Sequence, residues 1–290
     1  MVSIITVNYN GANDTCEMIE SFRKHETYTD YEIIVVDNGS SNPAEVPYIK
    51  ARCPEAMVIQ STNTGFAGGN NTGIRQAHGD YIFCLNNDTI IKAPILEPLV
   101  ARLQEGRTGA VSPMIRFSYP PYDIQYYGDN RMTPITLRKT TPPYDTAHQE
   151  QYSVAHPTEV LHGAAMMLRR DAIDQIGLMY EGFFLFYEEF DWSYLLSEQG
   201  YDIWYEPKAV VYHKEGQTIG KITPTRRQFL SRSRIIFARR HLNGLNKMLS
   251  CSYLLSIVLT RDIINFVRKG RFDLALAAIK GSWSGICAQL

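Results

Sequence analysis

The sequence lacks the glycine patterns that mark two large groups of nucleotide-binding proteins. Neither G-x-G-x-x-G nor G-x-x-x-x-G-K-[ST] occurs in its 290 residues, which argues against a dinucleotide dehydrogenase and a P-loop ATPase. The five cysteines are scattered and form no C-x-x-C pair, so we expect reduced thiols and neither a zinc site nor a disulfide framework. No basic region precedes the first apolar run, which predicts a cytoplasmic protein without a signal peptide.

Long hydrophobic runs are also scarce. The longest largely apolar stretch, residues 248–260, is shorter than the roughly 20 residues that a membrane-spanning helix needs. Hydrophobic residues make up 44% of the chain and charged residues 20%, which is ordinary for a globular protein and excludes a disordered chain. We therefore expect one large domain with a smaller appendage.

Acidic residues are nearly absent from one segment near the end of the chain. Residues 216–272 hold twelve Lys and Arg against a single acid, so the segment carries +11 although the formal net charge of the chain is −1. Apolar residues alternate there with Arg232, Arg234, Arg239 and Arg240, which predicts a basic amphipathic helix. Such a helix either lies on an anionic membrane or packs on the core with solvated arginines; the charge imbalance favours the membrane. No recognition motif accompanies the charge, so we expect no nucleic-acid partner.

Strand-like and helix-like patterns alternate over the first hundred residues. Apolar runs at 2–7, 32–36, 58–59 and 81–85 predict strands, and helical periods follow them. This order predicts a mostly parallel sheet with helices on both faces.

Two of the predicted helices carry start signals. Asp14 and Glu17 have the spacing of a capping box, and Asn42 is a candidate cap before Pro43 at the first helical position. Residues 113–160 differ, because they are rich in Pro, Tyr and Thr without a sustained period. We expect a long excursion or edge hairpin there, of the kind that is often functional. Further elements are predicted at 163–168, 171–176, 188–199 and 209–212, and from Thr225 onward the pattern is helical.

Polar clusters follow three of the predicted strands: Asn8-Tyr9-Asn10, Asp37-Asn38 and Asn87-Asp88. Ligands of parallel sheets bind beyond the carboxyl ends of the strands. Asp88 is suited to Mg²⁺ or Mn²⁺, Asp37-Asn38 to a base or ribose, and Tyr9 to stacking. Taken alone, the Asp88 cluster is more typical of a turn, but the coincidence of three such clusters favours a ligand site.

Glycines are concentrated before the third predicted helix, at Gly65, Gly68, Gly69 and Gly73. They would let the backbone approach a bound group and direct N–H donors at it, as in phosphate sites. His213 ends the last predicted strand. By spacing alone, a single histidine is more typical of a core or surface residue than of a metal ligand.

Carboxylates are concentrated after an aromatic run. Glu188, Glu189 and Asp191 follow Phe183-Phe184-Leu185-Phe186-Tyr187. An acid beside aromatic rings and other acids has a raised pKa, which suits a general base. The alternative is an acidic first turn that complements a helix dipole.

Six motifs occur in the order found in family 2 glycosyltransferases, and the chain is most similar to the bacterial rhamnosyltransferase-like branch over about residues 2–215. The motifs are Thr6-Val-Asn-Tyr-Asn10, Val36-Asp-Asn-Gly-Ser40, Asn63-Thr-Gly-Phe-Ala-Gly-Gly-Asn70, Leu85-Asn-Asn-Asp88, Gly163-Ala-Ala165 and Phe186-Tyr-Glu-Glu-Phe-Asp191. The resemblance implies a GT-A fold (a Rossmann-like mixed, mostly parallel sheet) and a C-terminal helical extension. It also implies a nucleotide-diphospho-sugar donor, a Mg²⁺ or Mn²⁺ ion, and inversion at the anomeric carbon.

The resemblance also implies roles for single residues. Glu189 would be the catalytic base, with Glu188 beside it and Asp191 as the reserve; Asp88 and His213 would bind the metal. The family's metal motif has lost one carboxylate here, and the base is Glu where Asp is common. Nucleotide-sugar binding would fall to Asn8, Tyr9, Asn10, Asp37, Asn38, Gly65, Phe66, Gly69, Asn70 and Asn87.

We therefore expect a catalytic domain at 1–215, with 113–160 on the acceptor side, and a basic helical extension at 216–290. The expected activity is transfer of a sugar from a UDP- or dTDP-sugar, such as dTDP-rhamnose, to a glycan or polyprenyl-linked acceptor in cell-surface polysaccharide synthesis. An anionic membrane contacted through 221–271 is a further expected partner and would place the protein on the inner face of the plasma membrane. The alternatives are a non-catalytic relic that binds sugar nucleotides or glycans, and another nucleotide-dependent α/β enzyme.

Overall fold

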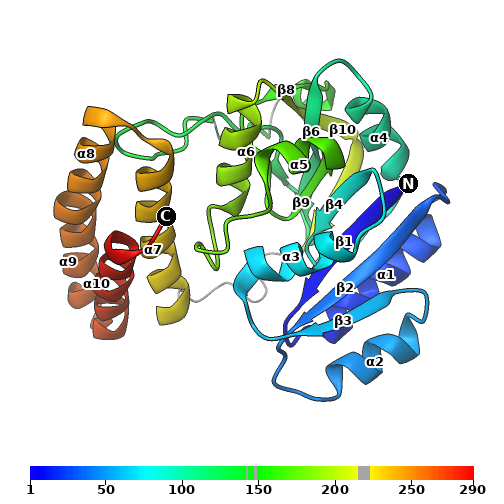
Figure 1. Ribbon diagram of the computed structural model, residues 1–290, viewed down its shortest axis with the longest axis horizontal. Helices are drawn as coiled ribbons and strands as arrows, with labels where there is room; N and C mark the ends of the chain where they lie inside the picture. Colours follow the sequence, from blue (N-terminus) through cyan, green and yellow to red (C-terminus); the bar gives the residue numbers. More distant parts are fainter. Residues whose placement is uncertain (142, 147–148, 215–222) are drawn as a thin grey trace.

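The structure, a computed structural model, describes residues 1–141, 143–146, 149–214 and 223–290. A mixed β-sheet in the order β3-β2-β1-β4-β9-β6-β10-β5 forms its centre (Figure 1). The strands on this path are β1 (Val2–Asn8), β2 (Tyr31–Asn38), β3 (Met57–Ser61), β4 (Tyr81–Leu85), β5 (Thr89–Ile91), β6 (Thr108–Phe117), β9 (Ala165–Arg169) and β10 (Asp202–His213).

Parallel pairing joins the first four strands, as the alternating pattern predicts. Beyond β4 the sheet changes character: β9 runs antiparallel to both β4 and β6, while β10 is parallel to β6 and antiparallel to β5. The second half of the sheet is therefore less parallel than expected. The sheet remains mixed, and the carboxyl ends of β4 and β10 both supply residues to the site.

Helices cover both faces of the sheet, as expected. Alternate strand residues separate the two cores: Ile4 and Val35 pack with α1, α2 and α4, whereas Ile5 and Val36 pack with α3, α5 and α6. Near-continuous apolar runs are typical of strands buried on both faces. The helices are α1 (Ala12–His25), α2 (Glu45–Arg52), α3 (Gly65–Gln76), α4 (Leu96–Leu103), α5 (Arg170–Ile176) and α6 (Glu188–Glu198).

Both predicted helix starts are wrong by a few residues. Helix α1 begins at Ala12 without a side-chain cap, and Asp14 and Glu17 instead pair with Lys214, at 2.6 and 2.5 Å. Helix α2 begins at Glu45, because Asn42 accepts from the Ala44 N–H in a turn that precedes the helix. In both cases a tertiary or turn partner takes the side chain that the pattern assigned to a cap.

The excursion predicted at 113–160 is shorter than expected. Strand β6 extends to Phe117, so residues 113–117 lie within the sheet. An edge hairpin follows, as predicted, in which β7 (Ile124–Tyr126) pairs antiparallel with β6. The 3₁₀ helix η1 (Gln149–Ser153) and β8 (His156–Thr158), which pairs with β10, return the chain to the sheet.

The C-terminal helices form a separate layer beside the sheet (Figure 1). They are α7 (Pro224–His241), α8 (Gly244–Tyr253), the π-helical turn η2 (Leu254–Val258), α9 (Leu259–Arg268) and α10 (Phe272–Cys287). Lys221 and the expected domain boundary after residue 215 lie outside the described residues. All five cysteines are free thiols, as predicted.

The arginines of α7 do not form the membrane-facing row that was predicted. Arg232 donates to the carbonyl oxygens of Gly182 and Phe183, and Arg239 donates to those of Gly285 and Ala288. Of the two arrangements predicted for this helix, these contacts favour the one in which α7 packs on the fold, and a membrane contact through 221–271 stays a prediction.

The expectation that the last apolar stretch is too short to span a membrane is also wrong. Residues from Gly244 to Arg268 form one continuous helix of 25 residues, which by length and composition is sufficient to cross a membrane, and 22% of its apolar window is buried.

Candidate active site

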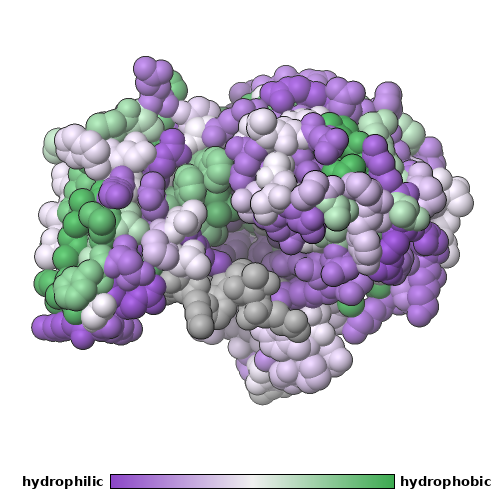
Figure 2. Space-filling view, turned by 90° about the horizontal axis from the view of Figure 1, so that it is seen from below, coloured by the Kyte–Doolittle hydropathy of each residue, from purple (hydrophilic) through white to green (hydrophobic). Residues whose placement is uncertain are grey.

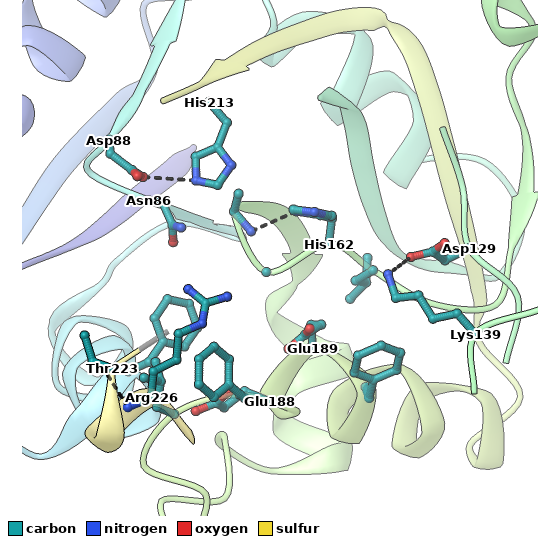
Figure 3. A pocket seen from close by; sticks show the side chains of 17 residues that line it. Asn86, Asp88, Asp129, Lys139, His162, Glu188, Glu189, His213, Thr223 and Arg226 are labelled. Carbon is teal, nitrogen blue, oxygen red and sulfur yellow. Dashed lines mark hydrogen bonds and ion pairs between the residues drawn. The ribbon is translucent and has the colours of Figure 1, made fainter. Parts of the chain in front are cut away.

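A cavity of about 540 Å³ opens at the carboxyl ends of β4 and β10 (Figure 3). Strand ends, the first turn of α6, the excursion and the start of α7 all contribute to its wall. The residues that line it are Phe66, Asn86, Asp88, Asp129, Lys139, Leu161, His162, Gly163, Ala164, Leu185, Phe186, Glu188, Glu189, Phe190, His213, Thr223 and Arg226.

Asp88 and His213 meet on one wall of the cavity. Asp88 follows β4 and His213 ends β10, and the His213 Nε2 atom lies 3.2 Å from Asp88 Oδ1. The other ring nitrogen, Nδ1, lies 3.0 Å from Gln125 Oε1. A carboxylate and an oriented imidazole are donors that Mn²⁺ accepts. No cluster of three or more His, Cys, Asp or Glu occurs in the described part of the chain, so an ion here would need further ligands from a substrate.

The aromatic run before α6 has an unusual backbone. Phe184, Phe186 and Tyr187 all have positive φ, at 66°, 70° and 79°. Non-glycine residues rarely adopt this region, and such residues are often found at functional sites. The run is held against α3, where the Phe66 N–H donates to the Phe184 carbonyl at 2.6 Å. This winding places Glu188 and Glu189 in the first turn of α6, facing the cavity.

Gly65 makes this contact sterically feasible. Its φ is +76°, and a Cβ atom there would lie 2.1 Å from the Phe184 carbonyl oxygen. The other glycines of the cluster have a packing role: a Cβ atom at Gly69 would lie 2.9 Å from Val7, and one at Gly73 would lie 2.5 Å from Ile5. The cluster thus brings α3 close to the sheet, and of the ten residues expected to bind the nucleotide sugar only Phe66 lines the cavity.

Glu188 and Glu189 differ in their surroundings. Glu188 is buried, its Oε1 atom has no hydrogen-bond partner, and burial together with the charge of Glu189 raises its pKa well above the usual value. Glu189 is half-buried and lies beside Gly163. Burial raises the pKa of Glu189 as well, while the charge of Lys139 opposes the shift. Among the described residues no side chain pairs with the Glu189 carboxylate, which leaves it available to a substrate.

Asp191, the reserve candidate for the base, does not line the cavity. Its side chain is 1% exposed, and Oδ1 lies 2.8 Å from Arg240 Nε and 2.7 Å from His241 Nε2. A buried carboxylate with two cationic or imidazole partners anchors α6 to α7 and is closed to a substrate. We therefore correct its assignment from catalysis to structure.

The polar strand ends are linked to one another. Asn8 Nδ2 donates to Asp37 Oδ1 at 2.9 Å, Thr15 Oγ1 donates to Asn8 Oδ1 at 2.9 Å, and Asn87 Nδ2 donates to Thr15 Oγ1 at 3.1 Å. The three predicted clusters therefore do meet at one edge of the sheet. Asn8 and Asp37 are nevertheless buried, and they use their polar atoms within this network.

Other residues expected to bind the donor are also engaged locally. Asn38 donates to the Gly65 carbonyl at 2.9 Å and accepts from the Thr64 N–H, and Asn70 donates to the Phe66 carbonyl. Asn10 has a φ of 54° and accepts from the Ser41 N–H. Tyr9 is 53% exposed, so its ring is the one in this group with a free face for stacking.

Several cavity residues were not predicted from the sequence. Burial and the nearby His213 lower the pKa of His162 to about 3; its Nδ1 atom accepts from the Ala164 N–H, so the neutral ring carries its proton on Nε2. Asp129 and Lys139 form an ion pair at 2.7 Å. Arg226 lies 5.2 Å from the Phe186 ring centre. Only the histidine has a local signal, a polar residue directly before the apolar run that forms β9; the others come together through folding.

A family model described as glycosyl transferase family 2 matches residues 3–177. The chain belongs to this family. The matched segment includes Asp88 but ends before Glu188, Glu189 and His213, so those three positions depend on the geometry described above.

Related sequences carry glycosyltransferase names. The low-salt glycan biosynthesis hexosyltransferase Agl10 of Haloferax volcanii is 26% identical over 208 residues, which are 70% of this chain and 63% of that protein. The poly-beta-1,6-N-acetyl-D-glucosamine synthase of Staphylococcus epidermidis is 26% identical over 227 residues, 76% of this chain and 51% of that one. The chain therefore spans about half to two thirds of the length of these relatives.

Two solved structures share the fold. The crystal structure of GalNAc-T7 with UDP, GalNAc and Mn²⁺ has a TM-score of 0.62 at 18% identity and covers 91% of this chain and 57% of its own. The mannosyltransferase PcManGT from Pyrobaculum calidifontis with GDP-Man and Mn²⁺ has a TM-score of 0.54 at 18% identity and covers 100% and 76%. The expected GT-A fold class is thereby confirmed.

Proposed function

We propose that the protein transfers a sugar from a nucleotide-diphospho-sugar to a hydroxyl of an acceptor, with inversion at the anomeric carbon. The observation that carries this proposal is the Glu189 carboxylate, which faces the cavity without a partner among the described residues, across from the Asp88–His213 pair. A base and a candidate diphosphate site on opposite walls leave room for a sugar between them. Family membership supports the same reaction class.

Asp88 and His213 are the residues that would hold a Mg²⁺ or Mn²⁺ ion, and the donor's phosphates would complete its ligands. The chemistry that such an ion supplies when bound is neutralisation of the charge that develops on the leaving diphosphate. Both structures of similar fold were solved with Mn²⁺, which supports a divalent metal without choosing between the two. His162, neutral and with its proton on Nε2, would donate a hydrogen bond to a sugar or acceptor oxygen in the cavity.

Glu189 would remove the proton from the acceptor hydroxyl. The hydroxyl oxygen then bonds to the anomeric carbon, the bond from that carbon to the diphosphate breaks, and the proton stays on the Glu189 carboxylate. A raised pKa improves a carboxylate as a base near neutral pH. Its position in the first turn of α6, near the strained aromatic run, fixes the direction of the carboxylate.

The donor that we propose is a UDP- or dTDP-sugar, with dTDP-rhamnose as the first to test. The acceptor would be a glycan or a polyprenyl-linked glycan in cell-surface polysaccharide synthesis, with residues after β6 on the acceptor side. The relatives named for glycan synthesis support this direction. A relic that only binds sugar nucleotides would not need Glu189 to be unpaired in the cavity, which makes that alternative the weaker one. The alternative of another nucleotide-dependent enzyme is opposed by the family match.

Calorimetric titration of UDP and dTDP, each with and without Mn²⁺, tests the donor site, and NAD serves as the control ligand. We expect one nucleotide to bind tightly in a Mn²⁺-dependent manner and NAD not to bind. Intact UDP- and dTDP-sugars are titrated in the same series, in case the sugar is needed for binding. Absence of binding by all of these ligands would refute the proposal.

A further inference from the structure

We propose that the outer surface of α8, α9 and α10 docks on an anionic lipid bilayer. This surface, called the apolar face below, includes six exposed side chains of α10 and the segment that follows it. They are Phe272, Leu276, Ile279, Trp283, Ile286 and Leu290, of which Phe272 and Trp283 are 66% and 68% exposed. Their spacing of four and three residues places them along one side of a helix.

The opposite side of α10 fixes which way the apolar face points. A Cβ atom at Gly281 would lie 2.1 Å from the Gln228 carbonyl oxygen, and one at Gly285 would lie 2.7 Å from the Arg232 carbonyl oxygen. These glycines let α10 pack closely against α7, so the helix cannot rotate to bury its apolar residues. The six side chains are thus held outward by the fold itself.

The neighbouring helix extends the apolar face. Leu245, Met248, Ile257, Ile264 and Val267 are all exposed along the continuous helix formed by α8, η2 and α9. Figure 2 shows hydrophobic residues gathered over this end of the molecule, whereas most of the catalytic layer in the same view is hydrophilic. An exposed apolar surface of several large side chains marks a site of contact with a membrane or another protein.

Charge favours a lipid surface over a second copy of the chain. Residues 244–290 contain six Lys or Arg and two acids, and both acids are already paired: Asp262 with Arg227 and Arg261, and Asp273 with Arg271. A symmetric dimer through this face would bring two positive surfaces together. An anionic bilayer instead offers hydrocarbon for the apolar residues and negative headgroups for the surrounding cations.

The geometry favours docking in the plane of the membrane over crossing it. The helix from Gly244 to Arg268 carries Asp262, which is buried against Arg227 of α7. If this helix crossed the membrane, Asp262 would be separated from Arg227 and its charge would lie in hydrocarbon. The exposed apolar residues of α10 lie along one side of that helix, as in helices that lie at the interface.

Docking through this surface would leave α7 between the bilayer and the cavity. Helix α7 connects the two, because Arg226 in its first turn lines the cavity and α10 packs along its length. The idea that docking brings a polyprenyl-linked acceptor closer to the cavity rests on the proposed function. Vesicle binding itself is measured without donor or acceptor, so its failure is distinguishable from a failure of catalysis.

Co-sedimentation of the full chain with vesicles tests the proposal. We expect binding to vesicles of phosphatidylcholine and phosphatidylglycerol at low salt, and much weaker binding to phosphatidylcholine alone. The double variant L276D/W283D should bind at least about tenfold more weakly. The control V154D changes a side chain that is 65% exposed but lies outside the apolar face, and it should bind normally. Replacing Arg268 or Lys269 with Gln should reduce binding about fivefold each.

Trp283 gives a direct readout of insertion. The other two tryptophans are Trp192, which is buried, and Trp204, which is partly buried, so quenching of fluorescence by brominated lipids should be lost in W283F.

Three results would each overturn the proposal: no binding to anionic vesicles, equal binding by L276D/W283D at unchanged thermal stability, or a stable dimer in light scattering that only this variant dissociates. Resistance to alkaline carbonate extraction would also overturn it, in favour of a spanning helix.

Discussion

Replacing Glu189 with Gln keeps the size of the side chain and removes its capacity to accept a proton. No side chain among the described residues pairs with the carboxylate, so the substitution breaks no ion pair and no hydrogen bond between side chains. A positioned general base contributes about 10²- to 10⁴-fold to a rate, which corresponds to about 3 to 5 kcal/mol of transition-state stabilisation. We therefore expect kcat to fall by this factor, with unchanged affinity for the nucleotide and no loss of stability, because burial disfavours the charged carboxylate that the substitution removes.

The assay is release of nucleoside diphosphate from the intact donor in the presence of acceptor, with calorimetry of the nucleotide in parallel. The pH dependence supplies a second readout. Because burial raises the pKa of Glu189, the base is protonated at low pH, and kcat should rise as the pH passes upward through that pKa. The Gln variant should lack this rise. Near-normal turnover by the variant would refute the assignment and leave its neighbour Glu188, which also lines the cavity, as the candidate.

Three further predictions concern the metal, the anchor of α6 and the strained run. Asp88→Asn should weaken the Mn²⁺-dependent part of nucleotide binding at least about tenfold in calorimetry; equal Mn²⁺ dependence would contradict the metal role. Asp191→Asn should lower the free energy of unfolding by about 3 to 5 kcal/mol, because it breaks a buried pair, whereas Glu55→Gln, in an exposed pair with Arg23, should cost about 1 kcal/mol or less. Gly65→Ala should cost about 2 to 4 kcal/mol from the collision with Phe184; Gly106→Ala, at φ +54° with nothing nearby, should cost about 1 to 2 kcal/mol, and equal costs would argue against the close contact.

The parallel half of the sheet could be predicted because its strands are mostly apolar runs followed by turns. Such runs have few alternative folds. The element predicted at 163–168 is confirmed as β9, but its antiparallel direction could not be predicted, since an apolar strand is compatible with either direction. The glycines at 65–73 are equally ambiguous, because the absence of a side chain permits a ligand to approach or a helix to pack on a sheet. The residues that surround the glycines decide between these two roles. Here they are Phe184, Val7 and Ile5, so the glycines serve packing.

The candidate site likewise contains some residues that the sequence indicates and others that only folding brings together. Asp88 and the acid pair stand at positions where a local switch from apolar to acidic residues is visible in the sequence. The role of Asp191 was mistaken because its partners, Arg240 and His241, lie some fifty residues away. Lys139 and Asp129 come from a segment without periodicity, and no spacing rule could bring them to the cavity.

The chain of hydrogen bonds from Asp37 through Asn8 and Thr15 to Asn87 has a consequence for how this protein can change. Within it, the buried Asn8 Oδ1 atom accepts from the Thr15 hydroxyl, so loss of that hydroxyl leaves a buried oxygen without its hydrogen-bond donor. Effects of substitution within the chain should not add, and a second change that removes the stranded atom should restore part of what the first one lost. Sequence drift at these four positions is therefore expected to be concerted, with paired replacements tolerated where single ones are not.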